Sequence, residues 1–450
     1  MRREGLMGEM RRKIDKELMD WKNRAHKPLM VFGARQTGKT TSLLEFGRAH
    51  YDQVVHVDFY KQAFAKSAFQ FDLTPGAAVE SLEALLDVEI VPGKTLLFLD
   101  EIQACDEALT ALKFFCTDAP EYDIVAAGSL LGVHVARQGS YPVGYVDMLS
   151  MGPMDFEEFC WAMGKERAFG LVRKSFERFT PCAVHDQMME LYRSYLLVGG
   201  MPEVVAKYSE GARLDEVREK QDELSVAYVA DMAKYATSAD TVKIVACWES
   251  LPEQLAKESG STKFVWRYVA SGAKAERYQT AVDWLAAAGL VNRCTQVSEG
   301  VAPLRSFESA SSFKLYALDT GLLSSWYRAE PGDFDDGGRR SARFRGGVAE
   351  NYVMQQLAAA RAAAYYWGAQ STYEVEFVVR IGDDIVPVEV KSGERVRSTS
   401  AKRFAEKYRC PYIVHVTAKN FGATDAVKSV PLYAAVLLGE QCQKRPLLAG

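Results

Sequence analysis

The sequence predicts an α/β protein in which a phosphate-binding domain is followed by a helical middle part and a second α/β domain. Three observations predict this class. A glycine-rich loop follows an apolar run near the N-terminus, a second apolar run ends in two acids, and two strand-like runs near the C-terminus carry glutamates and a lysine. These changes of pattern divide the chain into four expected domains, at residues 1–155, 156–240, 241–329 and 330–450.

Length and composition describe an ordinary globular protein. The chain has 450 residues, of which 48% are hydrophobic and 25% are charged, and this length favours about three domains. No run is long enough to span a membrane, and the basic N-terminus lacks the apolar segment of a secretory signal, so we expect a cytoplasmic protein without membrane contact. The 8 cysteines are scattered and only 6 histidines are present, which argues against zinc sites and disulfides.

The first motif is a phosphate-binding loop with the pattern G-x-x-x-x-G-K-T. In this pattern backbone N–H groups point at phosphate oxygens, the side chain of Lys39 reaches the β and γ phosphates, and the hydroxyl of Thr40 ligates Mg²⁺. An apolar run enters the loop and an amphipathic helical pattern leaves it, which favours ATP binding over a chance glycine turn. The expected nucleotide-binding residues of the loop are Gly33, Ala34, Arg35, Gln36, Thr37, Gly38, Lys39, Thr40 and Thr41.

The second motif is the buried run TLLFLDEIQ, residues 95–103. It is typical of the Walker B element of ATPases that place an extra strand between the two motifs. Asp100 is expected to hold Mg²⁺ through water and Glu101 to polarise the attacking water, since hydrolysis depends on positioned charge. We expect VVHVDF (54–59) to be the inserted strand and DIVAAGSLLG (123–132) to be the next one.

Two further features of the expected ATP site have alternatives. Ser129 lies at a strand end and suits a polar sensor of the γ phosphate, and capping of the following turn is an equal alternative. An arginine usually completes such a site. Arg35 and Arg137 are candidates within this chain, and a neighbouring subunit is another source.

The middle of the chain has helical periodicity. Residues 156–240 repeat apolar positions three and four apart, and Gly199 and Gly200 interrupt them. Three helical patterns follow in VKIVACWESLPEQLAKES, TKFVWRYVA and ERYQTAVDWLAAAGLVNRC, and two strand-like runs come after them. Three helices and a β wing predict a winged helix. Such a domain often reads DNA, here with Arg277 and Gln279 near the start of its third helix, and protein packing is the alternative.

The third motif is the stretch YEVEFVVRIGDDIVPVEVKSG, residues 373–393. A two-residue turn at Gly382 and Asp383 suits a type II′ hairpin, because the first turn position requires positive φ. Residue numbers that pair across this turn sum to 765. Pro387 predicts a bulge or an edge strand. Alternation predicts one wholly apolar face, made of Val375, Phe377, Val379, Val386, Val388 and Val390.

The polar face of the hairpin predicts a metal site. The register places Glu376 opposite Glu389, where two carboxylates about 5 Å apart repel each other. An Mg²⁺ ion between them converts the repulsion into ligation. Lys391 lies on the same face, where it can position a water or stabilise a phosphorane-like transition state, and Glu374 faces it as an ordinary ion pair. A solvated hairpin face is the alternative.

A third carboxylate, Glu350, lies in the helical pattern FRGGVAENYVMQQLAAARA upstream of the hairpin. A helix around RFAEKY and the strand PYIVHVT follow the hairpin. Helix, three strands, helix and strand is the order of the restriction-endonuclease core. From residue 331 onward the chain has 17 Lys and Arg against 13 Asp and Glu, a net +4 that leaves −8 for the rest. This basic part can face nucleic acid or be an ordinary solvated surface.

Together the motifs resemble those of the bacterial and archaeal ATP-binding proteins that join an AAA-type ATPase to a C-terminal domain of unknown function with a PD-(D/E)xK nuclease-like core. The matching motifs cover nearly the full length: GARQTGKTT, LLFLDEIQ, AAGSLLG, PMDFEEF, LVGGMP, FKLYALDTGLL, AENYV, EVEFVV and VEVKSG. The resemblance implies a nucleotide site at residues 33–41 with Asp100 and Glu101. It implies a nuclease-like site at Glu350, Glu376, Glu389 and Lys391.

One residue departs from the family pattern. The family usually shows E-V-D-F where this chain has EVEF, so Glu376 replaces an aspartate and changes the geometry offered to a metal. Two functions follow as expectations. The first is an ATPase, with ATP and Mg²⁺ as cofactors, whose nuclease-like domain acts on DNA. The alternative is a non-nucleolytic ATP-dependent switch, in which this domain binds DNA or a protein partner, a second copy of the chain included.

Overall fold

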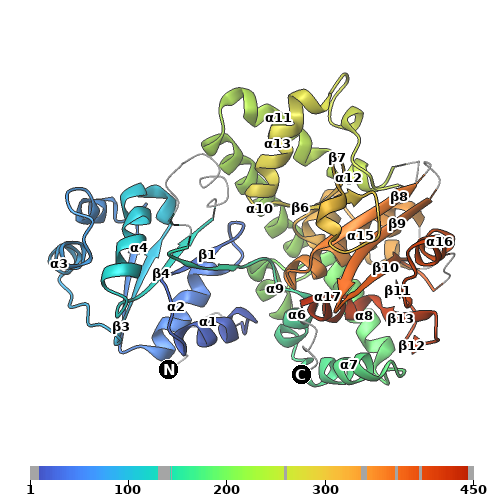
Figure 1. Ribbon diagram of the computed structural model, residues 1–450, viewed down its shortest axis with the longest axis horizontal. Coiled ribbons are helices and arrows are strands. Elements are labelled where there is room, and N and C mark those ends of the chain that lie inside the picture. The colour runs from blue at the N-terminus through green and yellow to red at the C-terminus, as the bar shows by residue number, and fades with distance from the viewer. Residues whose placement is uncertain are drawn as a thin grey trace. The chain divides into compact units, whose positions relative to one another are not determined.

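The computed structural model forms two compact units, which are described separately. The P-loop unit comprises residues 11–152 with 287–289, and the large unit comprises residues 153–286 and 290–450 with 1–10. The structure describes residues 10–129, 142, 144–257, 261–335, 342–369, 373–394 and 398–443. Most of their helices and strands are labelled in Figure 1.

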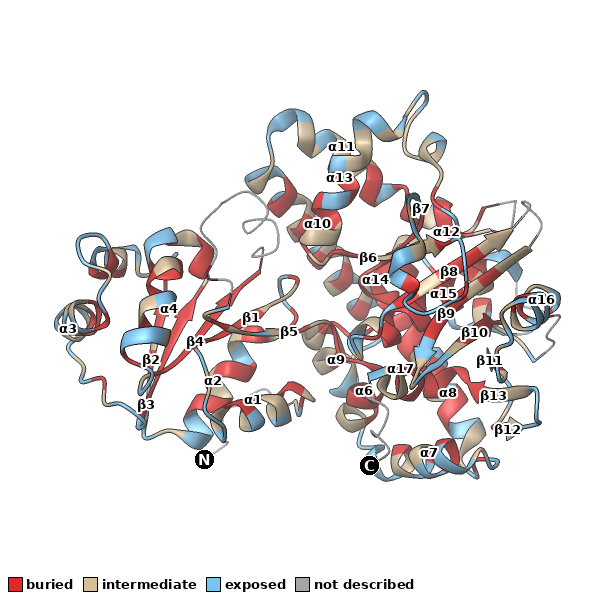
Figure 2. Cartoon of the chain, viewed as in Figure 1, coloured by how far each residue is buried: buried red, intermediate tan, exposed pale blue. Residues whose placement is uncertain are grey.

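The P-loop unit is built on a five-stranded parallel sheet in the order β2-β3-β4-β1-β5. Its strands are β1 (Leu29–Phe32), β2 (Gln53–Asp58), β3 (Thr95–Asp100), β4 (Asp123–Gly128) and β5 (Asp147–Ser150). Its helices are α1 (Ile14–Lys22), α2 (Lys39–His50), α3 (Pro75–Leu86) and α4 (Asp106–Asp118). Because both faces of a parallel sheet are covered, its central strands are apolar along most of their length, and every residue of β3 and β4 is buried (Figure 2).

Alternate residues of β3 enter two different cores. Leu96 and Phe98 pack with residues of α1 and α2, whereas Leu97 and Leu99 pack with residues of α3 and α4. The period of two along a strand therefore divides one apolar run between the two helical layers. This sandwich holds the C-terminal ends of β1, β3 and β4 at one edge of the sheet.

The position of the inserted strand differs from the expectation. β4, and not the segment 54–59, lies between β1 and β3, while β2 occupies the edge beside β3. The physical reason is polarity. β2 carries half-buried Gln53 and His56, whereas all six residues of β4 are buried and suit a central position.

The large unit contains an eight-stranded sheet in the order β12-β13-β11-β10-β9-β8-β6-β7. Its strands are β6 (Val291–Val297), β7 (Glu308–Ala317), β8 (Ala364–Ala369), β9 (Tyr373–Ile381), β10 (Asp384–Val390), β11 (Ile413–Thr417), β12 (Gly422–Ala423) and β13 (Val427–Pro431). Helix α15 (Ala342–Ala359) precedes β8, helix α16 (Thr399–Tyr408) precedes β11, and α17 (Ala435–Gln443) closes the unit. The order of helix, three strands, helix and strand is therefore confirmed.

The helical middle part belongs to the same unit. The expected helices over 156–240 are present as α6 (Phe156–Ala162), α7 (Glu166–Arg178), α8 (His185–Val198), α9 (Pro202–Ser209) and α10 (Leu214–Tyr235). They are followed by α11 (Ser238–Glu249), α12 (Leu251–Leu255), α13 (Ala275–Ala287) and, after β7, α14 (Thr320–Trp326). The boundary expected at 155 lies close to the start of the unit at 153, whereas 240 and 329 lie inside it.

The two strands expected as a β wing extend the C-terminal sheet instead. β6 pairs with β7 on one side and runs parallel to β8 on the other. The segment TKFVWRYVA also differs, because only a 3-10 turn at Trp266–Tyr268 forms there. Phe264 and Trp266 both pack on Phe313 of β7. Because these two residues are two positions apart, the apolar pattern of this segment has the period of a strand and not that of a helix.

The hairpin of β9 and β10 has the predicted register. The observed pairs, from Asp384 with Ile381 to Val388 with Phe377, all sum to 765, and Gly382 at the turn has φ of 62°. The predicted apolar face is buried throughout. The expectation from Pro387 is wrong, since β10 is a central strand between β9 and β11. Its pairing with β11 begins at Val388, one residue after the proline, so the missing N–H interrupts no observed pair there.

Two of the glycine motifs serve packing. α8 ends at Val198, and at Gly199, which follows it, φ is 75° and an added Cβ would lie 2.1 Å from a carboxylate oxygen of Asp319. That buried carboxylate accepts the backbone N–H of Gly200 at 2.6 Å and caps α14 through Leu322. The segments LVGGMP and LDTGLL therefore fit against each other.

Candidate functional site

The phosphate loop connects β1 to α2, as the sequence predicts. Gly33 has φ of 149°, and an added Cβ would lie 2.0 Å from the carbonyl oxygen of Met151, so only glycine fits. Gly38 has φ of 94° and precedes the first turn of α2. The loop thus opens onto a helix N-terminus, where unsatisfied N–H groups favour an anion.

Lys39 lies folded back into this loop. Its ammonium group donates to the carbonyl of Gly33 at 3.0 Å and to that of Ala34 at 2.7 Å. The side chain is buried, and this burial lowers the pKa of Lys39 to about 8, against the opposing influence of Glu101 and Asp100. A phosphate group would supply the negative charge that the two neutral carbonyls lack.

The expected Mg²⁺ ligands lie together at the C-terminal ends of β3 and the loop. Thr40 donates its hydroxyl to Asp100 at 2.9 Å, so strand and helix bring these groups within contact across 60 residues of sequence. His56 of β2 lies 3.3 Å from the same carboxylate oxygen, and its ring stacks on Phe98. The sequence alone did not indicate that His56 lies at this site. Its place two residues before the end of β2 predicts this only once β2 is known to pair with β3.

Glu101 follows Asp100 in a left-handed conformation, with φ of 52°. A non-glycine residue in this region is strained, and such strain often occurs at functional sites. Its carboxylate accepts a hydrogen bond from Gln103 and lies 3.4 Å from the hydroxyl of Ser129. Ser129 therefore contacts the expected catalytic acid, a position compatible with both alternatives stated for it. Arg137 lies outside the described residues.

The phosphate loop is held in place by Arg12, a residue outside the loop that the sequence patterns did not indicate. Its guanidinium donates to the carbonyl of Thr37 at 2.8 Å and to that of Gly152 at 2.9 Å. Thr37 also donates its hydroxyl to the carbonyl of Ala34 at 3.0 Å. These bonds give the backbone of the loop partners of its own, independent of any ligand.

The second candidate site is a carboxylate–lysine cluster in the large unit. Lys391, just after β10, lies 2.6 Å from Glu376 and 2.7 Å from Glu389, so one ammonium group joins both glutamates. Glu389 is 4% exposed. Burial raises the pKa of Glu376 to about 7, with Lys391 opposing and Glu389 reinforcing the shift. Burial disfavours the charge of Lys391, but the two carboxylates outweigh it and raise its pKa.

The expected pairing of Glu374 with Lys391 is wrong. Glu374 lies 2.6 Å from Lys314 instead, and its other oxygen accepts the hydroxyl of Ser261 at 2.7 Å. The reason is geometric, because Lys391 lies beyond the end of β10 and turns toward Glu376 and Glu389. Lys314 comes from β7, which the sequence assigned to a separate domain.

Glu350 completes the cluster from α15. One of its carboxylate oxygens, Oε2, accepts the hydroxyls of Thr262 at 2.6 Å and Tyr316 at 3.1 Å and lies 3.3 Å from the ammonium of Lys314. Lys314 is 0% exposed. The structure thus joins all four residues expected at the nuclease-like site, and it adds Lys314, Tyr316 and Thr262. The only sequence signal for the first two was the motif FKLYAL.

Two oxygens of the cluster are suited to a metal ion. Oε2 of Glu376 and Oε2 of Glu389 are buried and have no hydrogen-bond partner among the described residues. Hard cations take such oxygens, and Mg²⁺ needs only one or two carboxylates when it keeps several waters. Within the described ranges, no group of three or more His, Cys, Asp or Glu side chains forms a metal site. The pair therefore fits a hydrated ion and not a closed protein cage.

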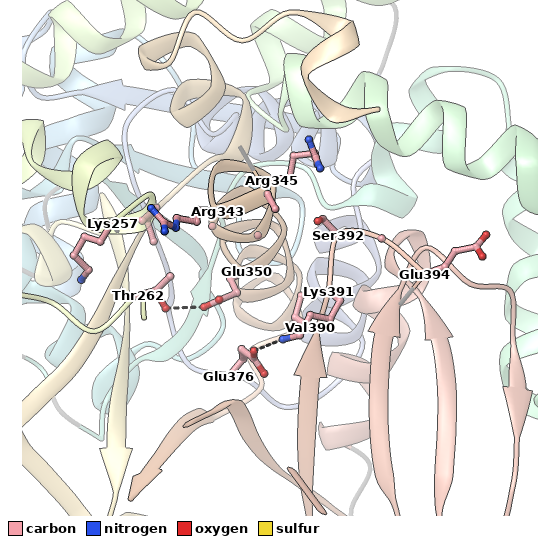
Figure 3. A pocket seen from close by; sticks show the side chains of 15 residues that line it. Lys257, Thr262, Arg343, Arg345, Glu350, Glu376, Val390, Lys391, Ser392 and Glu394 are labelled. Atoms are coloured by element: carbon pink, nitrogen blue, oxygen red, sulfur yellow. Dashed lines mark hydrogen bonds and ion pairs between the residues drawn. The ribbon is translucent and has the colours of Figure 1, made fainter. Parts of the chain in front are cut away.

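A cavity of about 880 Å³ opens over the cluster (Figure 3). Glu350, Glu376 and Lys391 line it, and each is largely buried or half-buried. Arg343 and Arg345, on the first turns of α15, line it as well, and Arg343 is exposed. The cavity therefore combines acidic groups in its wall with basic groups nearer to solvent.

Comparisons with known families cover three parts of the chain. Residues 25–160 match the family described as an AAA domain, residues 189–332 a domain of unknown function (DUF8612), and residues 345–435 a domain of unknown function (DUF4143). No curated protein matches the chain. The chain thus contains an N-terminal region similar to the AAA domain family and a C-terminal region similar to the DUF4143 family.

Three solved structures are similar to parts of the chain at low identity. The Walker-type ATPase PABY2304 of Pyrococcus abyssi is 13% identical over 72% of this chain and 97% of its own, with a TM-score of 0.42. Cdc6p from Pyrobaculum aerophilum is 10% identical over 70% and 91%, with a TM-score of 0.24. Drosophila ORC bound to DNA is 13% identical over 70% and 85%, with a TM-score of 0.24. Likeness at this level carries no argument about function.

None of the described helices is both long enough and apolar enough to cross a membrane.

Proposed function

We propose that the chain binds and hydrolyses ATP in the P-loop unit and couples this reaction to a nuclease-like site in the large unit that acts on DNA. The observation that carries the first half is the contact between Thr40 and Asp100 beside the strained Glu101. These three groups come from two separate motifs and meet at one edge of the sheet.

Each residue of the ATP site has a separate role. The loop N–H groups and Lys39 bind the phosphates, and Thr40 and Asp100 would hold Mg²⁺, which when bound neutralises developing charge. Glu101 orients and polarises the attacking water. Ser129, 3.4 Å from Glu101, holds that carboxylate toward the end of β4. Little covalent chemistry is required, because phosphoryl transfer depends mainly on position and charge.

Replacement of Glu101 by glutamine tests this proposal. We expect the rate of phosphate release from ATP to fall by about 100-fold or more, because the water loses its polarising charge. The affinity for a fluorescent ATP analogue should stay within about threefold, since the phosphate-binding groups are intact. Glu121→Gln, an exposed acid of the same unit, is the matched control. Equal hydrolysis rates for wild type and Glu101→Gln would show that Glu101 is not catalytic.

The second half of the proposal rests on the carboxylate–lysine cluster and its cavity. Glu376 and Glu389 offer two buried oxygens that could hold Mg²⁺, which when bound would polarise a phosphodiester. Lys391 is close enough to both acids to orient a water or stabilise the negative charge of a transition state. Arg343 and Arg345 supply positive charge at the cavity where a nucleic-acid backbone would lie.

The expected result is Mg²⁺-dependent nicking of supercoiled plasmid DNA by wild type. Glu389→Gln removes one of the two oxygens offered to the metal and should abolish nicking, and Lys391→Ala should do the same. Glu406→Gln, on the exposed side of α16, is the control and should nick normally. An absence of cleavage of any nucleic acid by wild type, with ATP and without it, would reject nuclease action.

A second candidate function is a non-nucleolytic switch. The observation that favours it is that Lys314 and Lys391 together contact Glu350, Glu374, Glu376 and Glu389, so the cluster has cationic partners of its own. Here ATP would change the affinity of the large unit for DNA or a protein. Nucleotide-dependent partner binding that survives Glu389→Ala and disappears in Lys39→Ala supports this switch. Binding that Glu389→Ala removes would favour the metal-dependent alternative.

A further inference from the structure

Lys257 is a buried lysine in the wall of the cavity that the proposed chemistry does not use. It lies two residues after α12, in the helical middle part, and is 4% exposed. Its ammonium group donates to the carbonyl of Lys263 and lies 3.5 Å from Oε1 of Gln254. Among the described residues no acidic group forms an ion pair with it, although a lysine this deeply buried is almost always paired. Its charge therefore has only neutral acceptors.

The phosphate loop holds Lys39 in a similar way. Lys39 is also buried, and its ammonium group donates to two backbone carbonyls. Burial is the main cause that lowers the pKa of each lysine to about 8, and Glu374 and Glu350 oppose the shift of Lys257 only from beyond ion-pair distance. A pKa of about 8 leaves both ammonium groups mostly charged at neutral pH. In each case an anion would supply the charge that the neutral partners lack.

The lining of the cavity indicates which anion would fit. Four basic residues line the space of about 880 Å³, namely Lys257, Arg343, Arg345 and Lys391. These cations come from separate segments of the chain, so positive charge meets the cavity at several points. A DNA strand carries one negative charge at each phosphate and binds where basic groups meet several phosphates. The lining therefore suits a sugar-phosphate backbone better than a small single anion.

Lys257 and the paired glutamates belong to different regions of the chain. Lys257 lies within residues 189–332, which match one domain of unknown function, and Glu376 lies within residues 345–435, which match another. In the view of Figure 3, Glu376 lies between Lys257 on one side of the cavity and Lys391 on the other. A strand with one phosphate at the glutamates could therefore be held from a second wall.

We propose that Lys257 is a binding residue that holds a backbone phosphate of a DNA strand in the cavity, so that the helical middle part and the C-terminal region bind the strand together. This inference rests on the action on DNA in the proposed function. The ammonium leaves Gln254 and the carbonyl of Lys263 and donates to a phosphate oxygen. Gln254 keeps other partners, because its side chain donates to the carbonyl of Val265 at 2.9 Å and accepts the N–H of Val265 at 3.0 Å.

DNA binding by Lys257→Met tests the inference. A fluorescein-labelled DNA duplex is titrated with the nucleotide-free full chain in EDTA, and fluorescence anisotropy gives Kd at several salt concentrations. We expect Kd to rise about tenfold, because one charge-assisted hydrogen bond is lost. The slope of log Kd against log salt concentration should become shallower by about 0.9, the contribution of one phosphate contact. An unchanged slope overturns the inference, because a merely structural lysine would not change the number of counterions released.

Lys263→Met is the matched control, because it removes the same charge from the same segment. Lys263 is exposed and is not among the described residues that line the cavity, and its carbonyl stays available to Lys257. Its Kd should stay within about twofold of that of wild type, since salt screens an exposed charge outside the cavity. An equal rise of Kd in both variants would reflect overall charge and overturns the inference.

Lys257→Gln keeps the test decisive if the methionine variant does not fold. Glutamine retains a hydrogen-bond donor for the neutral partners and removes only the charge, so we expect the same rise of Kd and the same shallower slope. A Lys257→Gln variant that binds DNA as wild type does contradicts the inference.

The choice of DNA as the ligand is tested separately. A wild type that binds DNA neither in EDTA nor with Ca²⁺ overturns the inference. So does a Lys257→Met variant that loses affinity for a polyglutamate peptide and keeps its affinity for DNA, a result that would favour an acidic protein partner.

Nicking of plasmid DNA separates this inference from the proposed function. Nicking by wild type, together with an unchanged DNA affinity in Lys257→Met, leaves the function standing and overturns the inference. A weaker DNA affinity in Lys257→Met, without nicking by wild type, supports the inference and rejects nuclease action.

Discussion

The two candidate sites each contain a buried lysine, and the two lysines are held in different ways. Lys39 donates to backbone carbonyls of its own loop, at most six residues away. Lys314 lies between carboxylates 36 and 60 residues away in sequence. The phosphate loop is thus complete as a local structure, whereas the carboxylate–lysine cluster exists only when several elements of the large unit are assembled. This difference indicates that the charge of Lys39 is placed to bind a ligand, whereas the charge of Lys314 also stabilises the fold.

The largest expected effect separates the two lysines directly. Lys314→Met should lower the free energy of unfolding by about 3–5 kcal/mol in the absence of metal, because it leaves buried carboxylates without their cation. Lys39→Met should change it by less than about 1 kcal/mol, since the lysine loses only carbonyl partners and its lowered pKa shows that burial works against its charge. Urea unfolding followed by hydrogen exchange measures each unit separately.

Similar losses of unfolding free energy in the two variants would contradict this difference between the lysines. A large loss in Lys39→Met would show that the phosphate loop depends on its lysine for folding. A small loss in Lys314→Met would show that Glu350 and Glu374 do not need their ammonium partner.

An intermediate effect is expected from Glu376→Asp, which restores the residue that the resembling family usually has. The shorter side chain withdraws its oxygen from Lys391, a contact of 2.6 Å, and should cost about 1–2 kcal/mol of stability. Urea denaturation measures this loss. Glu394→Asp, an exposed residue at the same cavity, should change stability by less than about 0.5 kcal/mol. A Glu376→Asp variant that is as stable as the wild type would mean that the side chain of Lys391 moves to keep its contact with the shorter carboxylate.

The smallest expected effect lies in the P-loop unit, at an ion pair far from its loop. The hydrogen bond to Asp123, 2.7 Å long, is the main cause that raises the pKa of His26 above its usual 6.5. A raised pKa means that the stabilisation is complete below pH 6.5 and fades as the pH rises through the folded-state pKa. His26→Gln should therefore cost at most about 1 kcal/mol at pH 5.5 and less at pH 8.5. Thermal unfolding at the two pH values checks the sign, and a difference that grows with pH would contradict it.

Much of the P-loop site could be predicted because its determinants are local. The loop pattern and the acidic end of the second apolar run assigned Thr40 and Asp100 to one Mg²⁺ site, and the structure places these two side chains in contact. The order of the strands could not be read in this way, and the segment 54–59 was misplaced. Strand order depends on which apolar runs are buried on both faces, and this becomes visible only when the helices are packed.

The hairpin of the second site also depends on local determinants, and its register followed from the turn at Gly382. The partners of its acidic groups were not local. Glu374 was expected to face Lys391 and instead meets Lys314, because β7 belongs to the same sheet as β9. No pattern within residues 373–393 contains that information.

The sequence by itself determined the phosphate loop, the acids at the end of β3, the helical middle part and the β9–β10 hairpin. Each of these depends on backbone conformation or periodicity over a few neighbouring residues. Only the tertiary structure decided that β6 and β7 join the C-terminal sheet and that Lys314 enters the carboxylate cluster. The physical reason is that an ion pair depends on distance in space, and distances between remote segments are set when the sheet is assembled and its core is packed.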